Sequence, residues 1–189
     1  LGLVLRGIFL GSNDEIRAYV EGRSGGSADS WQSFANTIPA AESADLLAAC
    51  ACSILAADPT IAVPAVRAWL NYERALMGEA PLNEVPDGAR MAKARIQMHY
   101  LTQACFLPPD ALLAGIERIR HIPAAIVHGT ADPVCPLSTA QELHRRWPEA
   151  RWLAVAGAGH AGLSPPIAEA CGKALGWVAG RVWDGWNGG

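Results

Sequence analysis

The stretch Ile122-Pro-Ala-Ala-Ile-Val-His-Gly-Thr-Ala-Asp132-Pro-Val-Cys135-Pro136 decides how we interpret the fold of this chain. Residues 124–128 form a short apolar run after a proline, which is typical of a strand buried inside a parallel sheet. Asp132 follows in a turn that contains a proline. The stretch therefore predicts a buried strand with an acidic side chain just beyond its carboxyl end.

A second strand with its helix follows along the chain. We expect a helix over residues 139–147, a strand over 151–156 and a helix over 166–182, because the apolar pattern alternates between extended and helical periods. Such alternation requires a parallel sheet. His160 stands among glycines directly after the second strand. We therefore expect Asp132 and His160 to lie within hydrogen-bond distance at the carboxyl edge of this sheet, where ligands bind in open α/β sheets.

The front of the chain adds one more strand and a helical block. Residues 1–5 are an apolar strand that we expect to pair in parallel with residues 124–128, and a chain that opens inside a sheet leads us to expect a partial sequence. Between residues 11 and 121 we find only alanine-rich helical patterns. We therefore divide the chain into a core strand (1–10), a helical insertion (11–121) and a C-terminal core (122–189).

Composition excludes several classes of protein. A content of 51% hydrophobic and 17% charged residues over 189 residues is typical of a globular domain. The net charge of −3, with no basic cluster, argues against a nucleic-acid partner. No apolar run reaches the ~18 residues of a membrane span. Five cysteines without metal-ligand or disulfide spacing indicate reduced thiols, a cytoplasmic location and no metal.

An acid and then a histidine, each after a late strand, follow the chain order of the Ser-His-Asp triad in α/β-hydrolases. In that interpretation His160 is the general base and Asp132 orients it; taken singly, each residue is more simply a turn aspartate or a loop histidine. We find no Gly-x-Ser-x-Gly nucleophile motif, and Gly25-Gly-Ser27-Ala-Asp29 lacks the closing glycine. The chain resembles the C-terminal part of an α/β-hydrolase fold, with three parallel strands and a helical cap insertion.

Two further patterns do not change this interpretation. Gly157-Ala-Gly159-His-Ala-Gly162 spells a dinucleotide-binding motif, but no strand with an acidic end follows it. We therefore expect no cofactor. The remaining histidines lack metal-ligand spacing, and we expect His128, at a strand end, to be a hydrogen-bonded core residue.

The sequence resembles one family in particular, the proline iminopeptidases, which are serine aminopeptidases of the α/β-hydrolase fold. The resemblance spans most of the chain. It is carried by Leu3-Val-Leu-Arg6-Gly-Ile-Phe9, Ala68-Trp69-Leu-Asn-Tyr-Glu73, Ala94-Arg95-Ile96-Gln97-Met-His99-Tyr100, Ile122-Pro-Ala-Ala-Ile-Val-His-Gly129 with Asp132 and Val134-Cys135, Trp147-Pro-Glu-Ala150, and Gly157-Ala-Gly-His160.

This resemblance implies roles for named residues. It implies Asp132 and His160 as triad members in an enzyme that removes N-terminal proline from small peptides. The residues implied near the pocket for the proline ring are Arg6, Phe9, Tyr19 and Cys135.

The resemblance also implies a partner for the substrate's amino group. Glu73 would face this ammonium, since a buried cation needs a carboxylate partner. Gln97 stands where the family has a second glutamate. The chain therefore departs from the family by one negative charge.

Two other functions stay open. An esterase or amidase of the same fold that acts on uncharged substrates is favoured by Gln97. A non-catalytic remnant that binds small molecules or partners is the alternative outside the enzymes. Because no nucleophilic serine motif is present, we expect this chain to be inactive alone. The sequence leaves the oligomeric state open.

Overall fold

The computed structural model describes residues 1–23, 28–38 and 44–187. The chain divides into two compact units. Unit 1 joins residues 1–10 to residues 109–189, and unit 2 holds residues 11–108. The sequence predicts that the helical block ends at residue 121, whereas in the structure residues 109–121 pack with unit 1.

Unit 1 is built on a parallel sheet with the strand order β1-β2-β3. The strands are β1 (Leu3–Arg6), β2 (Ala124–Gly129) and β3 (Arg151–Val155). Leu3 pairs with Ala124, and Ala125 pairs with Arg151, all in parallel register. The predicted parallel pairing of these three segments is confirmed.

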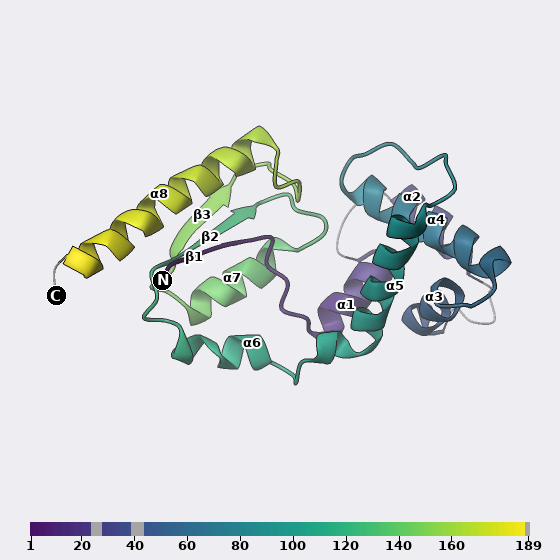
Figure 1. Ribbon diagram of the computed structural model, residues 1–189, viewed down its shortest axis with the longest axis horizontal. Coiled ribbons are helices and arrows are strands. Elements are labelled where there is room, and N and C mark those ends of the chain that lie inside the picture. The colour runs from purple at the N-terminus through teal and green to yellow at the C-terminus, as the bar shows by residue number, and fades with distance from the viewer. Residues whose placement is uncertain (24–27, 39–43, 188–189) are drawn as a thin grey trace. The chain divides into compact units, whose positions relative to one another are not determined.

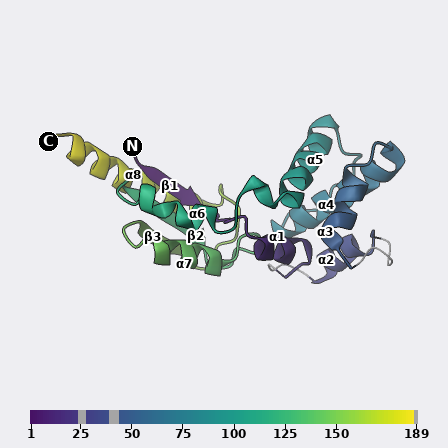
Figure 2. The ribbon, with the colours of Figure 1, turned by 90° about the horizontal axis from the view of Figure 1, so that it is seen from below.

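Helices cover both faces of this sheet (Figures 1 and 2). On one face Ala124 and Ile126 pack against α7 (Leu137–Arg146), and on the other Ala125 and Val127 pack against α8 (Pro165–Asn187). Successive residues of a strand point to opposite faces, so every residue of β2 is buried. This explains why the strand reads as an unbroken apolar run.

Residues 109–121 belong to unit 1 because their apolar side chains pack on the α7 face of the sheet. They form α6 (Ala111–Ala114) and the short 3₁₀ helix η3 (Ile116–Arg118). Leu113, Ile116 and Ile119 join the core cluster that contains Ile126 and Leu143. The segment thereby closes one face of the sheet.

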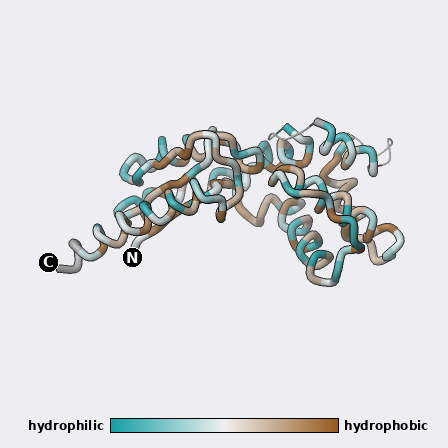
Figure 3. The backbone as a smooth tube through the Cα atoms, turned by 90° about the horizontal axis from the view of Figure 1, so that it is seen from above, coloured by the Kyte–Doolittle hydropathy of each residue, from teal (hydrophilic) through white to brown (hydrophobic). Residues whose placement is uncertain are grey.

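Unit 2 is helical in the part that the structure describes. It contains α1 (Asn13–Val20), α2 (Ala28–Ala35), α3 (Leu46–Ile54), α4 (Pro59–Leu76), α5 (Gly88–Thr102) and the 3₁₀ helix η2 (Ala104–Phe106). Hydrophilic and hydrophobic residues alternate along these helices (Figure 3). Their buried faces meet in a core that includes Ile54, Trp69, Tyr72 and Met98.

Polar side chains set where the helices of unit 2 begin. Ser12 accepts the amide of Glu15, whose carboxylate accepts the amide of Ser12 in return, which forms a capping box before α1. Asp45, Asp58 and Asp87 accept main-chain amides at the starts of α3, α4 and α5. Such caps are worth about 1 kcal/mol each. Among the described residues, no helix has both the length and the hydropathy needed to cross a membrane.

Candidate active site

The central feature of unit 1 is the contact between Asp132 and His160. Asp132 lies in the loop after β2 and His160 in the loop after β3, and the imidazole Nδ1 is 2.8 Å from the carboxylate Oδ2. The Asp132 side chain is 2% exposed and that of His160 is 21% exposed. The predicted proximity of these two side chains is confirmed. Because Nδ1 is held by the acid, Nε2 is the nitrogen that can exchange a proton with a reacting group.

Short hydrogen bonds hold the two loops together. The amide of Ala131 donates to the carbonyl of Ala158 over 3.0 Å, and the amide of Gly157 donates to the Thr130 hydroxyl over 2.8 Å. A side chain at Gly129 would collide with the carbonyl oxygen of Ala158. The glycine after β2 is therefore required by the close approach of the histidine loop.

The turn after β1 lies directly against the imidazole. Gly7 has a positive φ of 59°, and a Cβ built on it would lie 3.0 Å from Cε1 of His160. A residue with a side chain here would be strained and would also push the ring. The segment after β1 therefore helps to set the position of His160.

Arg6 ends β1 and contacts the loop that carries His160. Its guanidinium donates to the main-chain carbonyl of His160. It also packs over Gly162, where a Cβ would lie 3.0 Å from Cζ of Arg6. The substrate contact implied for Arg6 by the resemblance stays a prediction.

Phe9 and Cys135 complete the set of predicted site residues in unit 1. Phe9 is 39% exposed, so its ring is open to contact. Cys135 is buried, and its main-chain amide donates to Asp132 Oδ1 over 2.9 Å. The role of both residues beside a proline pocket stays a prediction.

The carboxylate of Asp132 is stabilised in its charged form. Burial alone would raise its pKa, but the hydrogen bonds from His160 and from the amides of Cys135 and Val134 outweigh burial, so the pKa lies below its ordinary value. The two amides reach Oδ1, both over 2.9 Å. Oδ2 is therefore left to hold His160 as an ionised acceptor.

This lowered pKa predicts a pH dependence of stability. The folded protein binds the Asp132 proton more weakly than the unfolded chain does, so the stabilisation is fully present above the unfolded pKa of ~3.9. It is lost as the pH falls through the folded pKa. We expect the difference in unfolding free energy between wild type and Asp132→Asn, measured by urea unfolding, to shrink from pH 7 to pH 3. An equal difference at both pH values would contradict this linkage.

Unit 2 holds the other three predicted site residues in one hydrogen-bonded cluster. Glu73 of α4 accepts from the Tyr19 hydroxyl at 2.9 Å and from the Gln97 amide at 2.6 Å, both on Oε1. Lys93 of α5, one turn before Gln97, lies 3.1 Å from Oε2. The Glu73 side chain is 13% exposed and that of Lys93 is 63% exposed. An exposed ammonium therefore already neutralises the carboxylate.

Aromatic rings form the support of this cluster. Tyr19 packs edge-on against Trp69, with ring centroids 5.6 Å apart. The Trp69 indole donates to the side-chain oxygen Oε1 of Gln97 over 3.1 Å. Burial and the nearby charge of Glu73 raise the pKa of Tyr72 to about 12, and they raise that of Tyr19 further. Both phenols therefore stay protonated and can donate to neighbouring oxygens.

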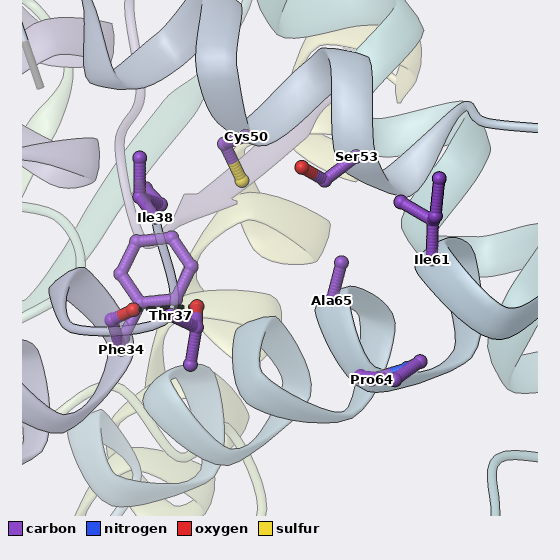
Figure 4. A pocket seen from close by; sticks show the side chains of 8 residues that line it. All are labelled: Phe34, Thr37, Ile38, Cys50, Ser53, Ile61, Pro64 and Ala65. Carbon is purple, nitrogen blue, oxygen red and sulfur yellow. Dashed lines mark hydrogen bonds between the residues drawn. The ribbon is translucent and has the colours of Figure 1, made fainter. Parts of the chain in front are cut away.

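Unit 2 also contains a pocket of about 220 Å³ that none of the predicted site residues lines (Figure 4). Its wall includes Phe34, Thr37, Cys50 and Ser53. The Thr37 hydroxyl is bound to the carbonyl of Phe34, and burial raises the pKa of the Cys50 thiol to about 12. The thiol therefore stays protonated, and the described residues that line the pocket include no ionised group.

The predicted site residues thus fall into two groups, one in each unit. Asp132, His160 and Arg6 are joined in unit 1, and Tyr19, Glu73 and Gln97 are joined in unit 2. Lys93 was not among the residues predicted from the sequence, because a lysine at an exposed position of a helix carries no signal of a functional role. In the part of the chain that the structure describes, no three His, Cys, Asp or Glu side chains gather as a metal site would require.

Comparison with known proteins relates this arrangement to one class of enzyme. A family model described as TAP-like protein matches residues 98–175. The chain is 36% identical to the proline iminopeptidase of Xanthomonas citri over 175 residues, which are 89% of this chain and 56% of that protein. It is 39% identical to the proline iminopeptidase of Arabidopsis thaliana over 176 residues, which are 88% of this chain and 46% of that protein.

A third relative gives the same result. The proline iminopeptidase of Neisseria gonorrhoeae is 36% identical over 179 residues, which are 92% of this chain and 57% of that protein. The chain thus spans about half the length of the curated relatives it matches. In sequence this chain is similar to the proline iminopeptidases over about half of their length, and its three-stranded parallel sheet is consistent with the C-terminal part of an α/β-hydrolase fold.

Proposed function

We propose that this chain is part of a serine aminopeptidase that releases N-terminal proline from peptides. The observation that carries the proposal is the hydrogen-bonded pair of Asp132 and His160 at the carboxyl ends of β2 and β3. The nucleophilic serine is proposed to lie in a part of the whole protein that these 189 residues do not include. The names of the related proteins support the choice of reaction.

In the proposed mechanism His160 accepts and returns one proton in each of two stages. Nε2 removes the proton of the serine hydroxyl as that oxygen attacks the carbonyl carbon of proline. The same proton passes to the leaving amine when the peptide bond breaks. Water then attacks the serine ester and gives a proton to Nε2, which returns it to the serine oxygen as proline is released. The buried carboxylate of Asp132 holds Nδ1–H and stabilises the charged imidazolium in both stages.

Glu73 is proposed to recognise the free amino group of the substrate. Its oxygen Oε1 accepts from Tyr19 and Gln97, and among the described residues Oε2 is held by the exposed ammonium of Lys93. A substrate ammonium can replace Lys93 there at little cost, because a surface ion pair is worth about 0–1 kcal/mol. The aromatic residues beneath the cluster keep the carboxylate in place.

The remaining parts of the proposal concern partners and location. We propose a cytoplasmic enzyme that acts on small peptides without a cofactor, with no nucleic-acid or membrane partner. Support comes from the net charge of −3, from the five cysteines that lack a disulfide framework, and from the peptidase names of the relatives.

The test compares three substrates on the whole protein. We expect cleavage of a proline arylamide, with kcat/KM at least ~100-fold higher than for the same compound with an acetylated nitrogen, because the acetyl group removes the ammonium that Glu73 would bind. A simple aryl ester is the third substrate.

The ester decides between the proposal and its alternative. Gln97, which leaves one negative charge fewer at the amine, favours an esterase of the same fold. Faster turnover of the ester than of the arylamide, together with indifference to acetylation, would establish the esterase and reject the aminopeptidase.

A further inference from the structure

His128 is a fully buried histidine that the proposed mechanism does not use. It stands near the end of β2, with 0% of its surface exposed. Its Nε2 lies 2.9 Å from the main-chain carbonyl oxygen of Cys135, and its Nδ1 lies 3.4 Å from the main-chain nitrogen of Ile8. Both ring nitrogens are therefore engaged with main-chain atoms of other segments.

These two contacts fix the position of the ring hydrogen. The carbonyl of Cys135 can only accept, so Nε2 must carry the hydrogen and donate it. The amide of Ile8 can only donate, so Nδ1 must be the acceptor. His128 is thus held in one tautomer, and it links the turn after β1 to the loop after β2.

Both linked segments contact the Asp132–His160 pair. Asp132 Oδ1 accepts the amide of Cys135, whose carbonyl is bound by His128, so the ring fixes the turn that aims the carboxylate. Ile8 follows Gly7, which lies against the imidazole of His160. The His128 Nε2 is itself 3.9 Å from Asp132 Oδ2, the atom that holds His160.

We propose that His128 is a positioning residue that sets the orientation of Asp132 toward His160, chiefly through its bond to the carbonyl of Cys135. The alternative is that His128 only fills the core and satisfies two main-chain groups. In that case its loss would lower stability and leave the Asp132–His160 hydrogen bond as it is. The two roles therefore predict different effects of losing His128 on the Nδ1 proton of His160, which can be measured.

The test uses two variants with amide side chains, each of which can keep one of the two hydrogen bonds made by His128. In His128→Gln the side-chain nitrogen can reach the place of Nε2 and donate to Cys135, whereas in His128→Asn the side-chain oxygen can reach the place of Nδ1 and accept from Ile8. His128→Leu keeps neither bond. Ile126→Ala, on the same strand and equally buried, is the control for loss of stability alone.

The first readout is the NMR signal of the His160 Nδ1 proton in the whole protein labelled with ¹⁵N-histidine, and His160→Gln assigns it. A hydrogen bond to a carboxylate moves this proton far downfield. We expect the signal to stay in wild type, His128→Gln and Ile126→Ala, and to move upfield or vanish in His128→Asn and His128→Leu. A wild-type signal in folded His128→Asn, or the same loss in His128→Gln as in His128→Asn, would overturn the proposal.

The second readout is kinetic and rests on the proposed function. We expect His128→Asn to lower kcat for a proline arylamide about 100-fold with KM little changed, because a small misplacement of a catalytic group costs this much. His128→Gln should recover most of this loss. If the whole protein cleaves no proline arylamide while the NMR pattern is as expected, the proposed function fails and the positioning role stands. A KM effect without a kcat effect would overturn the positioning role.

Discussion

Replacing His160 by alanine in the whole protein is expected to lower kcat for a proline arylamide by about 10⁶-fold, the usual cost of removing a triad base. The physical reason is that the serine hydroxyl then has no acceptor for its proton. Asp132→Asn should lower kcat by about 10⁴-fold, because the amide keeps the shape of the side chain but cannot stabilise the imidazolium. Stopped assays with high enzyme concentrations measure both losses.

A double variant and a control variant test the roles of His160 and Asp132. The double variant His160→Ala/Asp132→Asn should be no slower than His160→Ala alone, because the acid acts only through the imidazole. His144→Ala is the control, since it removes an imidazole in α7 that stacks on Trp152 and is not part of the Asp132–His160 pair. If His144→Ala lost as much activity as His160→Ala, or if the losses of the pair simply added, the assigned roles would be wrong.

The sheet and the contact between Asp132 and His160 could be predicted from the sequence because both follow from local patterns and chain order. An apolar run such as residues 124–128 is a strand whichever segment pairs with it, and parallel strands bring the loops after them to one edge. That is why Asp132 and His160 were predicted to meet without any knowledge of the side-chain contacts. The structure adds the register of the strands and the 2.8 Å contact.

The end of the helical block could not be predicted in the same way. Leu113, Ile116 and Ile119 show an apolar face, but periodicity does not say against which surface that face packs. In the structure these residues lie on the sheet beside α7. A boundary between units depends on such long-range contacts. The local pattern therefore predicts a boundary at residue 121, whereas unit 2 ends at residue 108.

The partners of the predicted site residues could not be predicted from the sequence either. His128 was expected to be a hydrogen-bonded core residue, and this is confirmed, but its partner Ile8 lies in a distant segment of the chain. Lys93 meets Glu73 only because α4 and α5 pack against each other. Partners of this kind follow from packing between elements, which no local pattern encodes.

Glu73→Gln is expected to lower kcat/KM for a free-amine proline arylamide by about 2 to 4 kcal/mol, or roughly 30- to 1,000-fold, since the substrate's ammonium would lose its buried partner. An uncharged aryl ester should change far less. The glutamine keeps an oxygen that can accept from Tyr19, so the aromatic cluster should stay intact. Steady-state kinetics with both substrates measure the difference.

Two neighbouring variants separate recognition of the amine from support of the helices. Gln97→Glu restores a second negative charge and should raise kcat/KM for the free amine selectively. Lys93→Gln removes the ammonium that now neutralises Oε2, and it should act in the same direction, because the substrate no longer competes with a cation of the protein itself. A purely structural Glu73 gives the opposite pattern: Lys93→Gln would weaken the cluster, and Glu73→Gln would slow amide and ester alike. The sign of the Lys93→Gln effect on the free amine therefore decides what the carboxylate of Glu73 is for.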